Sequence, residues 1–142
     1  MAAMQTERIA TWGEAEFSEP ATPDELDAAE ARLGHRLPEG LRSLLAECNG
    51  IVGDTGLGLL WDAARIGEQN EVFRTHKDFP ELYMPFEGLV FFGDAGNGDQ
   101  FFMSLSGLHE IYLWDHETDS RVHVAWSVLD YLEKSMQDRL EV

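Results

Sequence analysis

The fold of this chain is decided by residues 88–114, which read GLVFFGDAGNGDQFFMSLSGLHEIYLW. Leu89–Phe92 is an uninterrupted apolar run, short enough for a strand that is buried on both faces. The segment Asp94–Gly98 is rich in Gly, Asn and Asp, which tolerate the backbone angles of tight turns. A second strand is predicted over Asp99–Leu105 and, after another glycine-containing turn, a third over Glu110–Trp114. Three strands joined in series by short turns predict an antiparallel meander.

Capping signals predict two helices early in the chain. Thr22 caps a helix over Pro23–Leu33, Glu25 completes a capping box, and Gly34 provides the stop. A second helix is predicted to start near Pro38. Its core-facing stripe follows the three-four spacing of an amphipathic helix and consists of Leu41, Leu44, Leu45 and Cys48.

Two further helices and a fourth strand are predicted around the meander. Asp62 caps a helix over Ala63–Arg74. Arg121–Val124 reads as a fourth strand, and Ser127 caps a final helix with Asp130 three residues on. The apolar face of this last helix is predicted to comprise Leu129, Leu132 and Met136.

The order of helices, strands and a final helix predicts an α+β fold, in which helices pack on one face of an antiparallel meander sheet. We expect a single domain over residues 1–142, with a short strand at residues 59–61. Residues 1–19 are weakly patterned, and Trp12 and Phe17 are their only large apolar anchors. This segment is either a frayed start or a short element that docks these two rings.

The period-two alternation of the predicted strands sorts their side chains onto two faces. One face is apolar and is expected to meet the helices: Phe101, Met103, Leu105, Ile111, Leu113, Val122 and Val124. The other mixes aromatic with polar side chains: Gln100, Phe102, Ser104, Glu110, Tyr112, Trp114, Arg121 and His123. A face covered by solvent does not need such rings, whereas a binding face does. The alternative is that the N-terminal segment or the irregular segment Thr75–Pro85 covers them.

The meander also carries a family resemblance. The motif Gly-Asp-x-Gly-Asn-Gly-Asp-x-Phe at Gly93–Phe101 resembles the central motif of the SMI1/KNR4 family of the SUKH superfamily. Upstream, Leu33–Pro38 and Asn49–Gly50 are similar to the opening of that family, and the ordered matches span Pro23–Tyr131. The family often shows Gly-Gly-Asp where this chain has Asn97–Asp99. Because asparagine tolerates the left-handed region well, this departure is mild.

Composition limits the classes of partner and compartment. The 142 residues include 27 acidic and 10 basic ones, which gives a net charge of −17. Such a field repels nucleic acid and anionic membranes and attracts basic partners, although it also serves solubility alone. No apolar run reaches membrane-spanning length, and residues 1–8 lack the pattern of a signal peptide. Cys48 is the single cysteine, which fits a reducing cytoplasm, and its place on a helix stripe predicts a buried structural thiol.

No constellation in the sequence predicts catalysis. The glycine-rich turn gathers oxygen-bearing side chains, namely Asp94, Asn97 and Asp99. Their spacing is not that of an EF-hand calcium loop, and the turn lacks the lysine of a phosphate-binding loop. His116, Asp119 and His123 flank one predicted hairpin and could meet, but no nucleophile or oxyanion donor is indicated beside them. We therefore expect no enzyme activity, no cofactor and no metal.

The resemblance implies a bacterial immunity protein, which binds and neutralises a toxin domain delivered by neighbouring or kin cells. Such toxins are often nucleases or nucleic-acid-modifying enzymes with basic active-site clefts, and an acidic protein can occupy a cleft shaped for phosphates. The alternatives are an intracellular scaffold or regulatory module, and a small-ligand sensor with a pocket between the sheet face and Thr75–Pro85.

The expected partner is a protein, with no direct contact to nucleic acid or membrane, and the expected state is a cytoplasmic monomer or weak dimer. Tyr112 and Trp114 are the expected anchors of this interaction. The complete set of expected partner-binding residues is Trp61, Asp94, Asp99, Phe102, Glu110, Tyr112, Trp114, Asp115, Glu117 and Asp119.

Overall fold

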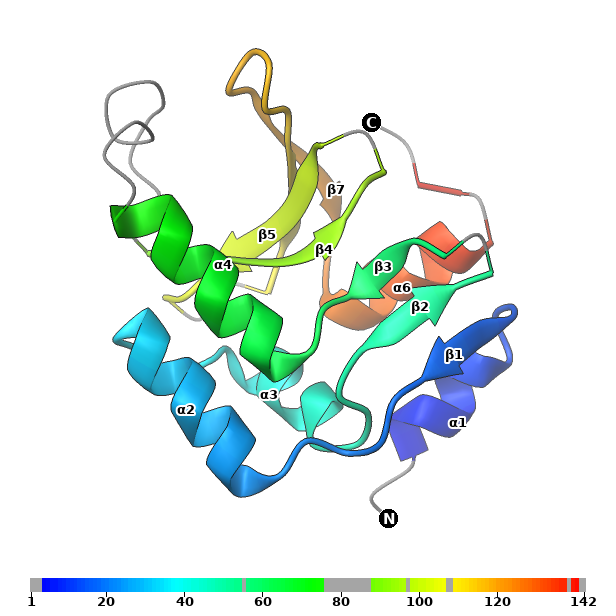
Figure 1. The fold of residues 1–142 in the computed structure, drawn as a ribbon. Coiled ribbons are helices and arrows are strands. Elements are labelled where there is room, and N and C mark those ends of the chain that lie inside the picture. Colours follow the sequence, from blue (N-terminus) through cyan, green and yellow to red (C-terminus); the bar gives the residue numbers. More distant parts are fainter. Residues whose placement is uncertain are drawn as a thin grey trace.

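The predicted meander forms the larger of two antiparallel sheets (Figure 1). Its strands follow in sequence order: β4 (Leu89–Asp94), β5 (Gln100–Ser104), β6 (Ile111–Trp114) and β7 (Arg121–Ala125). The computed structural model describes residues 4–54, 56–75, 88–96, 98–106, 109–137 and 139–140. Within these residues the mixed α+β class is confirmed.

The capping signals correctly predicted both ends of one helix and the start of another. In α2 (Pro23–Leu33), the Thr22 side chain accepts a hydrogen bond from the Glu25 backbone at 3.1 Å, and Glu25 Oε1 accepts one from the Thr22 backbone at 2.9 Å. Gly34 ends this helix with φ 71°, in the left-handed region. In α6 (Val128–Met136), Ser127 Oγ accepts from the Asp130 backbone at 3.0 Å, as predicted.

The helix α3 (Glu39–Leu45) follows Pro38 and is shorter than its apolar stripe. Its three leucines, Leu41, Leu44 and Leu45, have no exposed surface. Cys48 lies beyond the helix end but is also fully buried, which confirms a structural thiol. Burial raises the pKa of the Cys48 thiol, so it is a poor nucleophile.

The smaller sheet was only partly predicted. It consists of β1 (Ala15–Phe17), β2 (Ile51–Gly53) and β3 (Gly58–Leu60), in that order. At the start of the chain, α1 (Met4–Ala10) buries Ile9, and Trp12 and Phe17 pack against the core. The N-terminal segment is therefore a docked element over its described residues.

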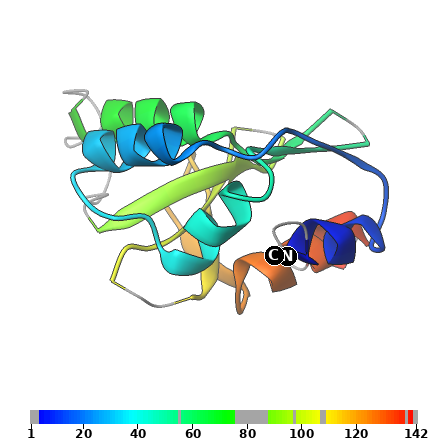
Figure 2. The same ribbon diagram turned by 90° about the horizontal axis from the view of Figure 1, so that it is seen from below.

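Helices cover both faces of the larger sheet, not one. In Figure 2, α2 and α4 (Ala63–Thr75) form a layer on one side of this sheet, and α6 lies on the other side. On the first side, Phe73 of α4 packs edge-on against Phe91 at 4.9 Å. On the second side, the centroid of the Tyr131 ring of α6 lies 4.6 Å from that of Phe101 and 5.4 Å from that of Phe92. The predicted assignment of residues to the two faces agrees with the observed pairing of β4 to β7.

Two residues explain how α4 packs so closely. Gly67 faces α2, where an added Cβ would lie 3.0 Å from the side chain of Arg32 and 3.3 Å from the backbone of Ala29. Asn70 is buried, and its amide bonds both the N–H and the C=O of Phe91, at 2.8 and 2.9 Å. Asn70 thus satisfies the edge of β4 as a neighbouring strand would.

The helix α6 joins the two sheets. Its buried side chains are Val128, Tyr131 and Leu132, whereas Leu129 and Met136 of the predicted face are only half-buried. The reason is that the Tyr131 hydroxyl reaches the smaller sheet and donates to the Leu59 carbonyl at 2.7 Å. No helix in the described ranges is both long enough and apolar enough to cross a bilayer.

Candidate functional site

One end of the larger sheet gathers most of the charged candidates. Four residues align across the strands there, namely Asp94, Gln100, Trp114 and Arg121. The β4–β5 and β6–β7 connections both leave the sheet at this row. We call the row and the described residues of these two connections the loop end. Six of the ten predicted residues belong to it: Asp94, Asp99, Trp114, Asp115, Glu117 and Asp119.

Arg65 of α4 links Trp61 to the loop end. Its guanidinium lies 3.1 Å from Asp94 Oδ2 and stacks over the Trp61 ring at 4.4 Å. The start of α4 fixes its position, because Asp62 Oδ1 accepts from the Arg65 backbone N–H at 2.7 Å. Trp61 itself is only 2% exposed and cannot contact a partner directly. Arg65 was absent from the predicted set, although its basic charge among acidic residues was visible in the sequence.

Asp99 and His116 join the two connections to each other. Asp99 Oδ1 lies 2.6 Å from His116 Nδ1 and also accepts from the His116 backbone N–H at 3.1 Å. The Asp99 side chain is 11% exposed, so it shapes the loop end from within. The hydrogen bond to Asp99 raises the pKa of His116; burial opposes this effect, and the charges of Asp99, Glu117 and Asp115 reinforce it.

This pair predicts a pH dependence of stability. The pKa of His116 is raised on folding, so the protonated ring stabilises the folded state. That stabilisation is fully present below the unfolded pKa and is lost as pH rises through the folded pKa. Asp99→Asn should lower the pKa of His116 and flatten this part of the stability profile. NMR titration of the His116 ring, with denaturant melts across the same pH range, measures both.

The control is Glu7→Gln, which removes one negative charge from the exposed side of α1. It should leave the titration of His116 unchanged. An Asp99→Asn protein in which His116 titrates as in the wild type would contradict the assigned cause.

Gly98 sits beside the same pair and has φ +94°, as its place in the turn predicted. An added Cβ would also lie 2.9 Å from the His116 ring. Gly98→Val is therefore expected to lower the free energy of unfolding by more than about 1 kcal/mol. Thermal and denaturant melts measure this loss. A Gly98→Val protein as stable as the wild type would show that the turn adjusts without cost.

Asp119 organises the β6–β7 connection. Its Oδ1 accepts from the Trp114 indole N–H at 2.8 Å and lies 3.2 Å from the Arg121 guanidinium. Asp119 is also the only described non-glycine residue with positive φ, at 58°. Asp115 Oδ1 accepts from the backbone of Glu117 at 2.9 Å, which tightens the same connection. Glu117 points outward and is exposed.

The expected open aromatic face is closed at two of its Phe, Tyr and Trp side chains. Phe102 and Trp114 are 4% and 3% exposed, because Phe91 and Phe73 pack against them. Trp114 is therefore a core residue and not a surface anchor. The predicted covering segment Thr75–Pro85 lies outside the described residues after Thr75, whereas the described helix α4 covers these rings in part.

The remaining predicted residues, Glu110 and Tyr112, lie further along the sheet and are half-buried. Glu110 Oε2 accepts from the Tyr112 hydroxyl at 3.0 Å. His123 lies beside this pair, with Nε2 3.8 Å from Glu110 Oε2. The sequence allowed His116, Asp119 and His123 to meet. In the structure His116 contacts Asp99, Asp119 contacts Trp114 and Arg121, and His123 lies beside Glu110.

The described residues contain one group that offers ligand atoms for a metal. Asp99, Asp115 and His116 each have such an atom, all within 4.8 Å of one another. Asp99 already bonds His116, and Asp115 already bonds its own turn. Internal hydrogen bonds therefore account for this geometry without a metal.

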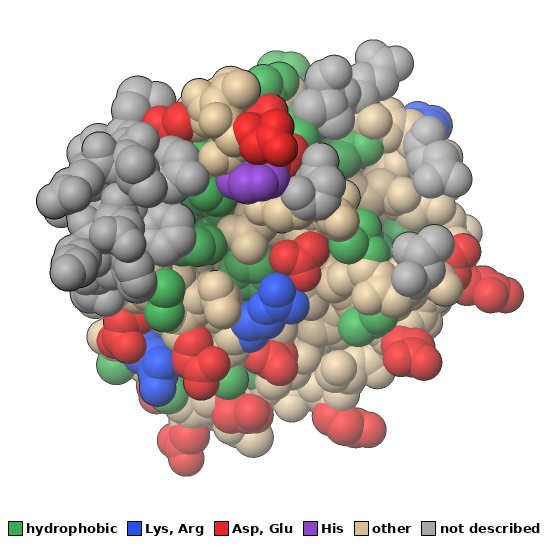
Figure 3. Space-filling model, turned by 45° about the horizontal axis from the view of Figure 1, so that its top comes forward, with side chains coloured by type: hydrophobic (Ala, Val, Ile, Leu, Met, Phe, Trp, Pro, Cys, Tyr) green, Lys and Arg blue, Asp and Glu red, His purple; other side chains and the backbone are tan. Residues whose placement is uncertain are grey.

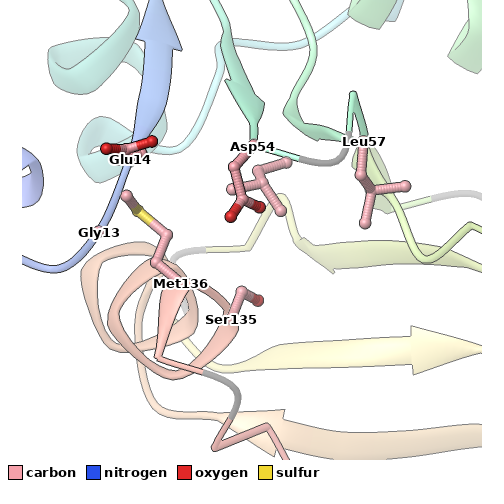
Figure 4. A pocket seen from close by; sticks show the side chains of 8 residues that line it. Gly13, Glu14, Asp54, Leu57, Ser135 and Met136 are labelled. Carbon is pink, nitrogen blue, oxygen red and sulfur yellow. The ribbon is translucent and has the colours of Figure 1, made fainter.

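A separate hollow lies between the smaller sheet and α6 (Figure 4). Its volume is about 270 Å³, and its lining includes Glu14, Asp54, Leu57, Ser135 and Met136. The lining has two carboxylates and no basic side chain. It differs in place from the ligand pocket expected near Thr75–Pro85.

Acidic side chains are spread over the face shown in Figure 3, where a histidine lies against acidic groups and few basic side chains are visible. Together with the net charge of −17, this arrangement suits contact with a basic surface. The described loop end holds no arrangement of nucleophile, base and oxyanion donor.

Sequence reasoning did not single out Trp126, which is 67% exposed just after β7. Its position directly before the Ser127 cap was the available signal, because a side chain there projects from a fixed backbone.

Comparison with protein-family models gave a match over most of the chain. The model of the SMI1 / KNR4 family (SUKH-1) matches residues 20–134. A search of curated proteins found no similar sequence.

Proposed function

We propose, from the premise that this chain belongs to the SMI1/KNR4 (SUKH-1) family, that it is an immunity protein for a bacterial toxin. Members of this family commonly act as toxin immunity proteins. The family match over residues 20–134 carries the proposal. The protein would bind the toxin domain of a polymorphic or contact-dependent system and neutralise it without catalysis.

The proposed partner is a basic toxin domain, such as a nuclease or a nucleic-acid-modifying enzyme. A cleft that binds phosphates presents positive charge, and a protein with net charge −17 is complementary to it. Binding would exclude the nucleic acid both sterically and electrostatically. The protein would act in the cytoplasm as a monomer or weak dimer. It would need no cofactor or metal and would bind neither nucleic acid nor membrane.

The loop end supports a division of roles among the predicted residues. Asp94, Asp115, Glu117 and Asp119 have side chains with exposed surface, and we propose that they face the toxin. Two buried residues of the set, Asp99 and Trp114, bond to the connections and hold them in shape, whereas Trp61 and Phe102 are core residues. Preorganised loops bind with less loss of conformational entropy than loops that must first become ordered.

Co-expression tests this proposal. The protein is produced together with the toxic domain encoded by the adjacent gene, and growth is compared with cells that carry the toxic domain alone. Restored growth and a complex that co-purifies from these cells are the expected results. If the adjacent gene encodes a growth-inhibiting domain that the protein neither captures nor counteracts, the proposal fails for that pair.

A further inference from the structure

Trp126 is the most exposed large apolar side chain in the described part of the chain, at 67%. Its position is nevertheless fixed. The Trp126 backbone N–H donates to Asp130 Oδ2 at 2.9 Å, directly before the cap of α6. Its ring lies on His123, with the ring centroids 4.5 Å apart. An exposed indole held in this way loses little entropy on binding.

Aromatic contacts connect Trp126 to the core. His123 meets Tyr112 edge-on at 5.6 Å, and Tyr112 stacks on Phe102 at 5.4 Å with the planes 15° apart. Phe102 is part of the hydrophobic core. The core thus supports Trp126 through this series of aromatic contacts. Tryptophan is also enriched among the side chains that contribute most to binding energy at protein interfaces.

A carboxylate lies on the same surface. Glu110 Oε2 accepts from the Tyr112 hydroxyl and is 3.8 Å from His123 Nε2. That ring nitrogen is shielded from solvent and makes no hydrogen bond within the described structure. A carboxylate near an exposed indole suits a guanidinium or ammonium group, which can pair with the acid and stack on the ring.

The outer edge of β7 continues this surface. Among the described residues, β7 pairs with β6 alone; residues 121–123 at its start keep exposed surface, whereas Val124 and Ala125 at its end are buried. Val122 on this strand is 42% exposed. Open strand edges accept an extended segment of another chain. Trp126 lies four residues beyond Val122, a distance that one extended segment can span, so the same segment can contact the indole and the exposed start of this edge.

We propose that the β7 edge, with Trp126, His123, Glu110 and Tyr112, docks an extended segment of the protein partner that places an arginine or lysine over Trp126. This inference rests on the proposed function, which supplies a basic partner. A second copy of this chain fits poorly, because two molecules of net charge −17 repel each other.

The first test needs no toxin. The probe is a blocked synthetic peptide of alternating valine and threonine with one central arginine, titrated into the isotope-labelled protein. NMR shifts should concentrate at the Trp126 indole N–H and the β7 amides, and hydrogen exchange of β7 should slow. Trp126→Ala should raise the Kd about tenfold or more. The matched control Val72→Ala, at another exposed side chain, should bind like the wild type.

The same peptide with glutamate in place of arginine should not bind. Shifts confined to the loop end, unchanged affinity of Trp126→Ala, or dimerisation of the protein through β7 would each overturn the inference. Co-expression with the toxic domain separates the two proposals. Failure of the wild type to protect cells rejects the immunity function, whereas equal complex lifetimes for wild type and Trp126→Ala reject the docking surface alone.

Discussion

Gly93→Ala is expected to lower the free energy of unfolding by about 3 kcal/mol or more. Gly93 lies in β4 where the two sheets approach each other. An added Cβ would be 2.5 Å from the Leu59 carbonyl oxygen and 2.9 Å from the Tyr131 hydroxyl. The Leu59 carbonyl belongs to the backbone of β3, so it can make room for the methyl group only if the strand moves. The two oxygen atoms also share a hydrogen bond of 2.7 Å. The substitution therefore combines steric overlap with the loss of a buried hydrogen bond.

Denaturant unfolding followed by tryptophan fluorescence measures the loss. Gly40→Ala is the matched control, because an added Cβ in α3 would meet no atom within 4 Å. That control should be neutral or slightly stabilising, since alanine favours helix more than glycine does. A Gly93→Ala protein within 1 kcal/mol of the wild type would mean that β3 and β4 can separate at little cost.

The sequence predicted best what neighbouring residues control. The caps at Thr22 and Ser127 and the stop at Gly34 depend on groups within one helical turn, so their identities were sufficient. The meander was predictable because Gly93–Gly98 separates two apolar runs. By contrast, the strands of the smaller sheet have three residues each, too few for alternation to show.

What the sequence could not show was which faces become covered. The period of two placed Phe102, Tyr112 and Trp114 together correctly, but it carries no information on distant partners. Phe73 covers Trp114 from a separate helix, and Asn70 fixes that helix on β4 through its buried amide. Such long-range packing overrides the local pattern, so the prediction of an open aromatic face was wrong for Phe102 and Trp114.

The sequence predicted the charged residues of the candidate site better than it predicted the contacts between them. Acidic residues near glycine-rich turns were recognisable in the sequence as surface groups, and the register brings them to one end of the sheet. The pairing of Asp99 with His116 needed two connections to meet and was missed. Trp126 was missed because it lies outside the alternating strands, in the link between β7 and α6.

Association with a basic toxin domain is expected to be faster at low salt, by roughly ten to a thousand-fold relative to an unsteered encounter. The cause is the net charge of −17, whose field salt screens over about 8 to 10 Å at physiological ionic strength. Surface-capture kinetics at two salt concentrations should show a falling association rate constant and a nearly constant dissociation rate constant. An association rate constant that does not change with salt would rule out electrostatic steering.

Charge reversal at one position locates the steering surface. Glu117→Lys at the exposed loop end should slow association, since rim charges act mainly on the encounter rate. Glu7→Lys makes the same change of charge on α1, which Figure 1 shows far from the β6–β7 connection. If both variants slow association equally, the net charge alone steers the toxin. If only Glu117→Lys does so, the field of the loop end directs the encounter, and the buried contacts then set how long the complex lasts.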